Sequence, residues 1–431
     1  MIDLTVHSGK NIALLGLGIS GIATATALIK DGANVFAWDD TDTARQCASD
    51  AGISVYDLQT LDFTTIDFLL ISPGISTEHA IAQRALQNNI TLIGEVKLLC
   101  DALPNNTYIG ITGTNGKSTT TALISHLLNI AGINHATGGN LGVPATALEP
   151  LNNGVYVLEM SSYMLERLDG MKFNIGVFLN LSTDHLQRHK TMDGYLNAKA
   201  HLFDNMTSND TAIIAMDDIY GQMMCDKVQN AKIQHVSCQD ETQDYPYLSG
   251  QHNRQNIACL RRVADILNID NALVEKALST FTGLVHRQEY VSSIDTVSFI
   301  NDSKATNAES SAKALSAYKN IYWIAGGQEK GTYEDLTAHL GNITKAYLIG
   351  EGAHNIHAFL TTQGTDAVIC HTMEKAVAQA YEDARKNSHN THVVLSPACA
   401  SWDQYKSFEH RGDDFKRIIE AITNQDIKNG K

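Results

Sequence analysis

The sequence predicts an α/β fold of three domains, each built on a mostly parallel sheet flanked by helices. Two observations predict this fold. Short apolar runs typical of buried strands alternate with helical stretches along the whole chain, and its 431 residues amount to roughly two to three typical domains. Strands joined through helices run parallel and have both faces of their sheet covered. The expected domains span residues 1–93, 94–283 and 284–431.

The first domain is expected to begin with a strand, a glycine-rich turn and a helix of small residues. Its predicted strands are residues 12–15, 35–38 and 68–71, and its helix runs from about residue 22 to 30. Residues 11–29 are 19 uncharged positions, which makes a transmembrane helix the alternative. A strand–turn–helix unit explains Gly16, Gly18 and Gly21, so membrane insertion is not expected. Residues 1–10 hold no apolar stretch of the kind found in signal peptides.

The other two domains repeat this alternation. The strand candidates are continuous apolar runs, as expected where both faces of a sheet are buried. In the second domain these runs are residues 108–111, 155–158, 176–179 and 212–215, with helices over 117–131 and 251–267. In the third domain they are residues 297–300, 321–324, 346–349 and 392–395, with helices over 372–386 and 413–423.

Composition excludes several classes of protein. The hydrophobic content of 43%, six prolines and 31 glycines are ordinary for a globular chain and exclude a collagen-like or low-complexity one. The net charge of −15 argues against nucleic acid or an anionic membrane as a partner. Seven scattered cysteines without a CxxC pair indicate neither a zinc site nor a disulfide framework, but reduced thiols in a cytoplasmic protein.

A phosphate-binding loop is the most specific motif. Between a predicted strand and a predicted helix stand Gly113, Thr114, Asn115, Gly116, Lys117, Ser118 and Thr119. In this context main-chain N–H groups face phosphate oxygens, Lys117 bridges the β- and γ-phosphates, and Ser118 or Thr119 binds Mg²⁺. The loop is not a strict Walker A motif, because Ile111 stands where its first glycine would fall. A glycine-rich turn without a nucleotide is the alternative.

A second glycine-rich turn lies in the first domain, over Gly16–Gly21. With Asp39 and Asp40 at the end of the next strand, it has the form of a dinucleotide-binding fingerprint. The signal indicates only that a diphosphate or ribose sits over the turn. A dehydrogenase and an enzyme with a nucleotide-linked substrate both fit. The turn Ser72–Gly74 is expected at the same edge of the sheet.

Charged residues follow two strands of the second domain. Glu159 follows one strand, and Asp184 and His185 follow another, so all three are expected near the loop of Lys117. Mg²⁺ prefers carboxylates, which suits Glu159, whereas a histidine is a less usual ligand. Solvated loop residues are the alternative. Lys199, by composition alone, is interpreted as an exposed lysine on a helix.

Two polar segments follow strands of the third domain. Residues 301–307 (Asn-Asp-Ser-Lys-Ala-Thr-Asn) contain almost nothing apolar, and residues 396–401 read Ser-Pro-Ala-Cys-Ala-Ser. Loops after parallel strands are where functional residues usually lie. A simple polar turn would not need Asp302, Lys304 and Thr306 so close together.

These motifs together resemble the Mur ligases of peptidoglycan precursor synthesis over nearly the whole chain. The shared segments are residues 16–18, 112–119, 139–140, 159–162, 184–185, 198–199, 250–256, 282–287, 301–307, 326–327 and 396–408. The central motifs also occur in folylpolyglutamate synthase, whereas residues 301–307 and 396–408 are similar to the branch of the family that adds D-glutamate. The resemblance implies Rossmann-like first and third domains around a central P-loop ATPase domain.

The resemblance also implies a role for each matching residue. Lys117, His185 and Lys199 would be catalytic, and Lys199 would carry a carbamate. Two Mg²⁺ ions would be held by Ser118, Glu159, His185 and Lys199. ATP would contact residues 113–119, Asn256, Arg287 and Asp302. The UDP-linked substrate would contact Gly18, Ser20, Asp39, Ser72, Gly74, Asn140 and His185. D-Glutamate would contact Lys304, Thr306, Lys330, Ser401 and Phe408.

Four positions depart from the family pattern. Met164 replaces a glutamine, and its thioether is only a weak acceptor. Asp40 and Thr41 stand where relatives carry Thr-Arg, so a cation near the diphosphate is lost. Trp402 replaces a smaller apolar residue, and Val285 replaces a proline.

The activity implied is ATP-dependent amide-bond formation between D-glutamate and UDP-N-acetylmuramoyl-L-alanine through an acyl phosphate, in a cytoplasmic and monomeric enzyme. Three alternatives remain. A sister Mur ligase or folylpolyglutamate synthase would lack residues 301–307 as written. A nicotinamide dehydrogenase would leave Lys117, Ser118 and Thr119 unexplained. A non-enzymatic nucleotide sensor would not need the pocket from Lys304 to Phe408.

Overall fold

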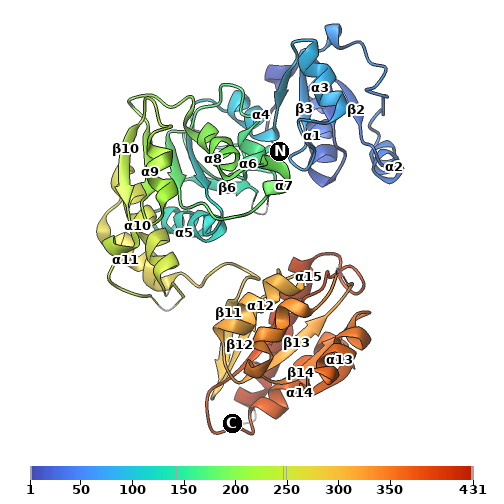
Figure 1. Cartoon of the computed structure of the whole chain (residues 1–431), viewed down its shortest axis with the longest axis vertical. Coiled ribbons are helices and arrows are strands. Elements are labelled where there is room, and N and C mark those ends of the chain that lie inside the picture. Colours follow the sequence, from blue (N-terminus) through green and yellow to red (C-terminus); the bar gives the residue numbers. More distant parts are fainter. Residues whose placement is uncertain (1, 141–142, 246, 249, 330, 429–431) are drawn as a thin grey trace. The chain divides into compact units, whose positions relative to one another are not determined.

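The computed structural model describes residues 2–140, 143–245, 247–248, 250–329 and 331–428. The chain forms two compact units, Met1–Phe281 and Thr282–Lys431, coloured blue to yellow and yellow-orange to red in Figure 1. Within the described residues, the first unit holds two sheets and the second holds one. The prediction of three domains with mostly parallel sheets is confirmed, while the boundaries at residues 93 and 283 stay predictions.

The first sheet is parallel, in the order β2-β1-β3-β4. Its strands are β1 (Asn11–Leu15), β2 (Asn34–Trp38), β3 (Phe68–Ile71) and β4 (Thr91–Ile93). Its helices are α1 (Ile19–Lys30), α2 (Asp42–Asp50) and α3 (Ala80–Gln87), with short 3-10 helices η1 (Thr5–His7) and η2 (Phe63–Thr65). Because side chains alternate along β1, Leu14 shares a core with Leu28 of α1, and Leu15 shares one with Ala82 of α3.

The segment tested as a membrane span is β1, a turn and α1, as predicted. Throughout the described ranges, each helix is too short or too polar to cross a membrane.

The second sheet is also parallel, in the order β10-β9-β8-β5-β7-β6. Its strands are β5 (Thr107–Thr112), β6 (His135–Gly139), β7 (Val155–Glu159), β8 (Ile175–Phe178), β9 (Thr211–Ala215) and β10 (Lys232–Val236). The helices are α4 (Glu95–Ala102), α5 (Lys117–Ile130), α6 (Ser162–Leu165), α7 (Leu186–His189), α8 (Met192–Ala200), α9 (Ile219–Cys225), α10 (Gln251–Ile266) and α11 (Asn271–Thr280), with 3-10 helices η3 (Ala145–Ala147), η4 (His201–Phe203) and η5 (Cys238–Asp240).

Two cores cover the faces of this second sheet. On one face Ile109 and Ile111 of β5 pack with α5, α10 and α11, through residues such as Leu127, Leu260 and Val274. On the other face Tyr108 and neighbouring strand residues share a core with α4 and α8. Figure 1 shows α5, α10 and α11 grouped together on their side of the sheet. Because the sheet is parallel, all six strands have their carboxyl ends at one edge, and the loops of the candidate site lie there.

The third sheet follows the order β11-β12-β16-β13-β14-β15 and is parallel except for its edge strand β11. Its strands are β11 (Glu289–Ile294), β12 (Val297–Asn301), β13 (Ile321–Gly326), β14 (Ile343–Ile349), β15 (Ala367–His371) and β16 (Thr391–Leu395). The helices are α12 (Ala308–Ala317), α13 (Ala353–Thr362), α14 (Met373–Ala384) and α15 (Phe408–Lys428), with 3-10 helix η6 (Glu334–Asn342).

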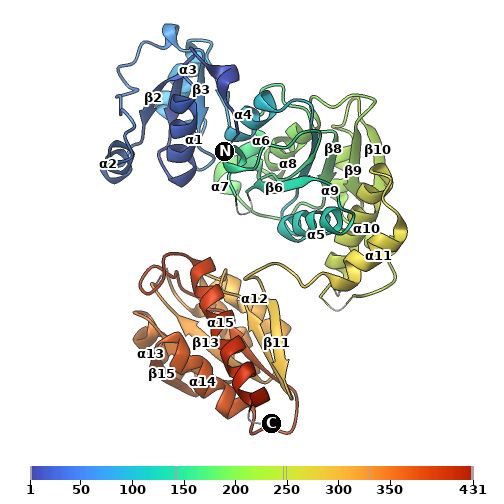
Figure 2. The same ribbon diagram turned by 180° about the vertical axis from the view of Figure 1, so that it is seen from behind.

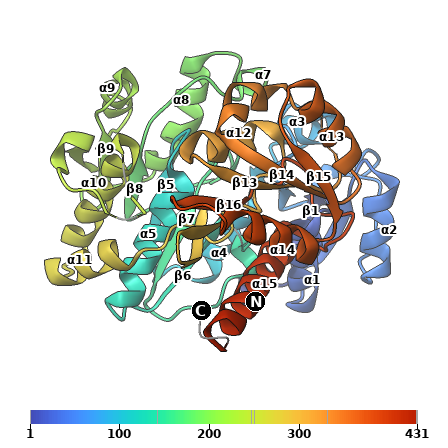
Figure 3. The same cartoon turned by 90° about the horizontal axis from the view of Figure 1, so that it is seen from below.

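Helices cover both faces of the third sheet. Leu315 of α12 and Ile356 of α13 share one core with Trp323, whereas Val377 of α14 and Phe415 of α15 share the other with strand residues. Figure 2 shows α14 and α15 on their common face, and Figure 3 shows the same two helices side by side. The third domain is thus the three-layer arrangement expected for strands alternating with helices.

The predicted strands and helices are present, with ends that differ by a few residues. The helix expected from residue 413 begins at Phe408, five residues earlier. The sequence did not indicate this start, because the apolar spacing that marks the helix weakens at its polar first turn. The strands β4, β6, β10, β11 and β15 were not predicted. All five are edge strands, and they carry polar residues or glycines that weaken the apolar signal.

Candidate active site

The loop between β5 and α5 is shaped by two glycines with positive φ. Gly113 has φ 153° and Gly116 has φ 84°, and the latter precedes the first residue of α5. A Cβ atom at Gly116 would lie 2.7 Å from Oδ1 of Asn256, so the loop packs closely against α10. This strand–loop–helix arrangement is the context that the phosphate-loop prediction required.

Lys117 folds back over this loop. Its Nζ donates hydrogen bonds to the main-chain oxygens of Gly113 (2.9 Å) and Thr114 (2.8 Å). The ammonium is therefore fixed at the mouth of the loop, beside the N-terminus of the 14-residue helix α5. Two positive elements, the lysine and the helix end, converge where phosphate oxygens would bind.

The loop is supported by residues that the sequence prediction missed. Asn180, after β8, accepts a hydrogen bond from Asn115 N at its Oδ1 (2.9 Å) and one from Thr114 N at its main-chain oxygen (3.0 Å). Its amide donates to Gln255 of α10 (3.2 Å), which in turn donates to Asp217 after β9 (2.6 Å). The position of Asn180 directly after an apolar strand was the signal that could have found it.

Asn256 is buried and holds the loop from the other side. Its Oδ1 accepts a hydrogen bond from Thr120 of α5 (3.1 Å), and its Nδ2 donates to Asn253 (3.1 Å). The predicted ATP residues of the first unit, Gly113–Thr119 and Asn256, are therefore brought together.

Glu159 is the last residue of β7 and lies in the interior, 2% exposed. Its Oε1 accepts a hydrogen bond from Nδ2 of Asn140 (2.7 Å), which follows β6. Its other oxygen, Oε2, is buried and has no hydrogen-bond partner among the described residues. A buried carboxylate oxygen without a partner is costly unless a cation or donor satisfies it, so Glu159 suits a bound cation.

A magnesium ion fits this edge of the sheet with few protein ligands. Among the described residues, no three His, Cys, Asp or Glu side chains cluster closely enough to form a metal cage. Mg²⁺ usually takes one or two protein ligands and completes its shell with phosphate oxygens and water. The carboxylate of Glu159 and the buried residue Ser118 at the start of α5 fit that pattern.

Lys199 is buried, 1% exposed, so its interpretation as an exposed helix lysine is wrong. The residues of α8 from Tyr195 onward are almost all interior, which a polar pattern of Asn197 and Lys199 does not indicate. Its Nζ donates to the main-chain oxygen of Gly113 (2.8 Å) and lies 4.5 Å from the ring centroid of Tyr195. Burial, together with the charge of Lys117, holds the pKa of this ammonium well below its usual range, although Asp184 and Glu159 act in the opposite direction.

His185 belongs to a cluster of four rings beside these residues. Its ring centroid lies 5.2 Å from that of Tyr163, and the ring of His189 stacks on Tyr195 at 5.0 Å. His185 itself has φ 54° at the start of α7 and pairs with Asp184 through Nε2 at 3.4 Å. The predicted group of Glu159, His185 and Lys199 therefore lies on elements that meet near the phosphate loop.

The turn after β1 is built by close main-chain approach. A Cβ atom at Gly21 would lie 1.9 Å from the main-chain oxygen of Gly16, so only glycine lets α1 begin there. Ser72 donates its hydroxyl hydrogen to the same oxygen (3.0 Å), which joins the turns after β1 and β3. In contrast, a Cβ atom at Gly18 or Gly74 would meet nothing within 4 Å, which leaves open space over both predicted substrate contacts.

Asp39 and Ser20 are held by neighbouring groups. The carboxylate of Asp39 accepts hydrogen bonds from Leu17 N (2.8 Å) and from Thr41 N (2.9 Å). Ser20 donates its hydroxyl hydrogen to the buried Glu95 of α4 (2.6 Å). Burial raises the pKa of Glu95, whereas the hydrogen bond from Ser20 lowers it. A small cavity of about 10 Å³ is lined by Ser20 and Glu95 together with the Ser72–Pro73 turn.

Arg167 fixes the turn after β3. It is 1% exposed, and its guanidinium donates to the main-chain oxygens of Ser72 (2.7 Å) and Ile75. Burial lowers the pKa of this guanidinium to about 10, so it stays charged at neutral pH. The sequence prediction did not include Arg167, because nothing in its neighbourhood marks a partner 95 residues away.

In the second unit the predicted nucleotide residue Asp302 follows β12. It is 4% exposed, and its carboxylate accepts hydrogen bonds from Ser396 Oγ (2.7 Å) and Gln288 N (3.1 Å). Burial raises the pKa of Asp302 to about 7, although these hydrogen bonds and the charge of Arg287 lower it. Arg287, the other predicted nucleotide residue of this unit, is exposed nearby.

The predicted D-glutamate residues lie on loops at one edge of the third sheet. Lys304 Nζ lies 5.7 Å from the ring centroid of Phe408, at the start of α15. Thr306 donates its main-chain N–H to the oxygen of Lys304 (2.9 Å), and Ser401 is buried after β16. Lys330 lies outside the described residues.

The four departures from the family pattern occupy different environments. Met164 is buried in the apolar core of the first unit, and Asp40 pairs with His79 (2.9 Å). Val285 is exposed, and Trp402, directly after Ser401, is 64% exposed.

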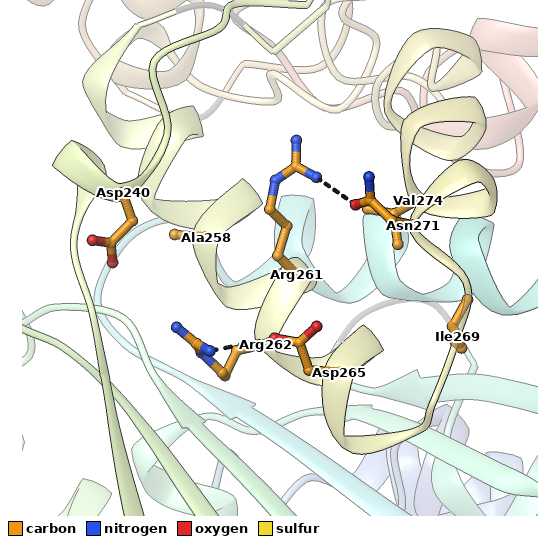
Figure 4. A pocket seen from close by; sticks show the side chains of 8 residues that line it. All are labelled: Asp240, Ala258, Arg261, Arg262, Asp265, Ile269, Asn271 and Val274. Carbon is orange, nitrogen blue, oxygen red and sulfur yellow. Dashed lines mark hydrogen bonds and ion pairs between the residues drawn. The ribbon is translucent and has the colours of Figure 1, made fainter.

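A separate pocket of about 200 Å³ lies between α10, α11 and η5 (Figure 4). Arg261 in its wall is paired with Glu241 and Glu275, and Arg262 is paired with Asp265. Its lining shares no residue with the phosphate loop or with the groups that hold this loop. Because both arginines are neutralised, the pocket offers little to an anionic ligand.

Three protein-family descriptions match successive parts of the chain. They are "Mur ligase MurD-like, N-terminal domain" over residues 10–94, "Mur ligase middle domain" over 111–275, and "Mur ligase, glutamate ligase domain" over 286–399. Together they cover most of the segments from which the site is built, whereas Ser401 and Phe408 lie beyond the last matched residue.

Curated relatives match over the whole length. Proteins named UDP-N-acetylmuramoylalanine--D-glutamate ligase from Paramagnetospirillum magneticum and Sphingopyxis alaskensis are 40% and 39% identical to this chain. Each alignment covers 98% of this chain, and 99% and 100% of the two relatives.

Solved structures share the fold at low identity. The UDP-N-acetylmuramate-alanine ligase MurC of Thermotoga maritima is 16% identical with a TM-score of 0.55, over 95% of this chain and 99% of that one. MurF of Acinetobacter baumannii is 15% identical with a TM-score of 0.55, over 82% and 86% of the two chains. These likenesses support the three-domain architecture alone.

Proposed function

Because the chain belongs to the Mur ligase family, we propose that it joins D-glutamate to UDP-N-acetylmuramoyl-L-alanine at the expense of ATP, in peptidoglycan precursor synthesis. The observation that carries the proposal is the convergence of Lys117, Glu159 and Lys199 on the Gly113–Thr119 loop. Full-length identity of about 40% with ligases of this name supplies the choice of amino acid.

The reaction proceeds in two steps. The terminal carboxylate of the UDP-linked substrate attacks the γ-phosphorus of ATP, which forms an acyl phosphate and releases ADP. The amine of D-glutamate then attacks the acyl carbon, loses a proton, and the phosphate leaves as the amide forms. Phosphorylation is needed because a free carboxylate repels nucleophiles and has no leaving group, so catalysis rests on positioning and on charge stabilisation.

Lys117 and the N-terminus of α5 supply the positive groups for the transferred phosphoryl group. Lys117 is held at the loop by two carbonyl oxygens, so it is placed before ATP binds. Such preorganised charge costs no rearrangement during the reaction. Mg²⁺, when bound, neutralises phosphate charge, and Ser118, Glu159, His185 and Lys199 are the residues proposed to hold two such ions.

Lys199 is proposed to carry a carbamate. Its amine is buried and hydrogen-bonded to a main-chain oxygen, and its pKa is lowered chiefly by burial. A neutral amine is the form that adds to CO₂, since it has a free electron pair. The addition forms an N–C bond and releases one proton, which turns the neutral amine into an anionic metal ligand.

The residues proposed to contact the substrates belong to both units. The UDP-linked substrate is proposed to contact Gly18, Ser20, Asp39, Ser72, Gly74, Asn140 and His185. For the nucleotide, Asn256, Arg287 and Asp302 are proposed, and for D-glutamate Lys304, Thr306, Lys330, Ser401 and Phe408. The enzyme is proposed to act as a monomer in the cytoplasm.

An amino-acid panel tests the proposal. The protein is incubated with ATP, Mg²⁺ and UDP-N-acetylmuramoyl-L-alanine, and phosphate release is measured with D-glutamate, L-glutamate, L-alanine, a diamino acid or D-alanyl-D-alanine. Release that requires both UDP-N-acetylmuramoyl-L-alanine and D-glutamate supports the proposal. Better release with another amino acid would identify a sister ligase, and NADH-linked absorbance changes would identify a dehydrogenase.

L-Glutamate is the sharpest control in this panel. It has the same charges as D-glutamate, but when both of its carboxylates are bound its amine points away from the acyl carbon. A pocket built for these groups is expected to reject the enantiomer by as much as about 10⁴-fold.

A further inference from the structure

Arg411 is the fourth residue of α15 and is fully buried, 0% exposed. A long cationic side chain in such a place is rare unless its charge is satisfied. Burial lowers the pKa of this guanidinium to about 10, so it stays protonated at neutral pH. Its surroundings therefore determine what a buried positive charge does in this unit.

Five hydrogen bonds surround the guanidinium. Nε donates to Ser303 Oγ (3.0 Å), Nη1 donates to the oxygens of Gly326 (3.4 Å) and Ala400 (3.2 Å), and Nη2 donates to those of Ser303 (2.9 Å) and Cys399 (3.1 Å). An arginine has five N–H groups, and each of them has an acceptor here. None of these five acceptors is a carboxylate.

The acceptors belong to three loops that follow three strands. Ser303 follows β12, Gly326 ends β13, and Cys399 and Ala400 follow β16. Two of these loops lead directly into a residue proposed to bind D-glutamate. Lys304 follows Ser303, and Ser401 follows Ala400. Arg411 is thus a common anchor for these loops, held three residues beyond Phe408 on α15.

Two further contacts make the anchor stiff. Ser303 Oγ accepts from Arg411 and donates its own hydrogen to the main-chain oxygen of Phe408 (2.8 Å), so Phe408 is held by the same network. A Cβ atom at Gly327 would lie 2.2 Å from the oxygen of Ala400 and 3.0 Å from Nη1 of Arg411. The loops pack so closely against the guanidinium that no residue larger than glycine fits at position 327.

We propose that Arg411 is a positioning residue for D-glutamate. Arg411 fixes the loops of Lys304, Ser401 and Phe408 relative to one another. Its charge acts in the same sense, because none of the acceptors that hold the guanidinium is a carboxylate, and a positive charge favours the binding of an amino acid with two carboxylates nearby. The inference rests on the proposed function and adds to it the residue that sets the shape of the amino-acid pocket.

Two variants test whether the planar guanidinium is needed. Arg411→Lys keeps a positive charge but loses the planar fork, and Arg411→Met keeps length without charge or donors. Both are expected to raise the KM for D-glutamate by about 10- to 100-fold, since a loop displacement of about 1 Å costs this much. The KM values for ATP and UDP-N-acetylmuramoyl-L-alanine are expected to stay within about 2-fold of the parent.

A KM that rises for D-glutamate but not for ATP or the UDP-linked substrate would exclude a merely structural role for Arg411. A variant that is only less stable has fewer active molecules, which lowers the apparent kcat and leaves all three KM values unchanged. Arg417→Met is the matched control. Arg417 lies on the same helix but is exposed and paired with Asp414 and Glu374, so its loss is expected to change none of the three values.

A milder variant covers the case in which loss of Arg411 prevents folding. Ser303→Ala removes only the hydroxyl between Arg411 and Phe408, and it is expected to raise the KM for D-glutamate by about 3- to 10-fold. Folded variants whose KM for D-glutamate stays within about 2-fold of the parent, or whose three KM values rise together, overturn the inference. A parent enzyme that uses another amino acid but not D-glutamate overturns the proposed function, and this inference with it.

Discussion

Lys117 and Lys199 donate to the same acceptor, the main-chain oxygen of Gly113, at 2.9 and 2.8 Å. Two ammonium groups so close repel one another, and this is one reason why the pKa of Lys199 is low. A carbamate on Lys199 would replace the repulsion by attraction. The geometry of one carbonyl oxygen thus connects the phosphate-binding lysine to the residue proposed as a metal ligand.

Lys117→Ala is expected to lower kcat by about 10²- to 10³-fold, because one preorganised cation is lost from the site of phosphoryl transfer. Phosphate release under saturating substrates measures the effect, and circular dichroism checks that the variant is folded. Turnover close to that of the parent in a folded variant would contradict the assignment of the phosphate loop.

Lys199→Ala is expected to lose activity, and short carboxylates such as acetate or formate are expected to restore part of it by supplying an anion in the vacated space. Lys190→Ala is the control, because Lys190 is 66% exposed and pairs only weakly with Glu78 at 3.9 Å. Intact-mass measurement of the parent under CO₂ tests the carbamate directly. Absence of both the added mass and the rescue would refute this role.

Asp302 predicts a pH dependence of stability in the second unit. Its folded pKa of about 7 is raised above the unfolded value of about 4. The stabilisation from this group is complete below pH of about 4 and is lost as the pH rises through about 7, by an amount on the order of a few kcal/mol.

Asp302→Asn is therefore expected to unfold at a higher temperature than the parent at pH 8, and at a similar temperature at pH 4. Thermal unfolding followed by circular dichroism across this range measures the difference. A parent and variant with parallel pH profiles would show that Asp302 does not titrate differently on folding.

At the scale of single elements, two glycines at the start of α1 differ in how much space surrounds them. Gly21 is in close contact with the main chain, and Gly18 is not. Gly21→Ala is expected to destabilise the first unit by at least about 1–3 kcal/mol, because the new Cβ atom would overlap the oxygen of Gly16. Gly18→Ala has open space, so it should leave stability nearly unchanged and instead raise the KM for the UDP-linked substrate. Equal melting temperatures for the two variants would contradict this reading of the turn.

The strands, the helices and the loops at their carboxyl ends were predictable because apolar runs and glycine-rich turns are local signals. Glu159 was found in this way, from its place after a strand. The partners of these loops were not predictable, because they depend on contacts between distant segments. Asn180 meets Gln255, and Arg411 meets Ser303, 108 residues earlier in the chain. The burial of Lys199 was hidden for the same reason.

For the whole molecule, the two units have separate cores. The cores of the second unit contain only residues beyond Phe281. Calorimetry is therefore expected to show two unfolding transitions rather than one. Gly21→Ala should lower only one of them, and Asp302→Asn should shift only the other. A single two-state transition shared by both variants would contradict independent cores.

The exposed indole of Trp402, beside Ser401, is expected to give the second unit a distinct tryptophan fluorescence. The chain has three tryptophans, and they differ in environment. Trp323 is wholly interior, and its indole N–H donates a hydrogen bond to the main-chain oxygen of Ser396, whereas Trp402 is 64% exposed. Emission from Trp402 should lie at longer wavelength and be open to quenching by acrylamide. Since Trp402 adjoins the proposed D-glutamate contacts, occupation of that pocket should reduce quenching, which would report amino-acid binding in real time without a label.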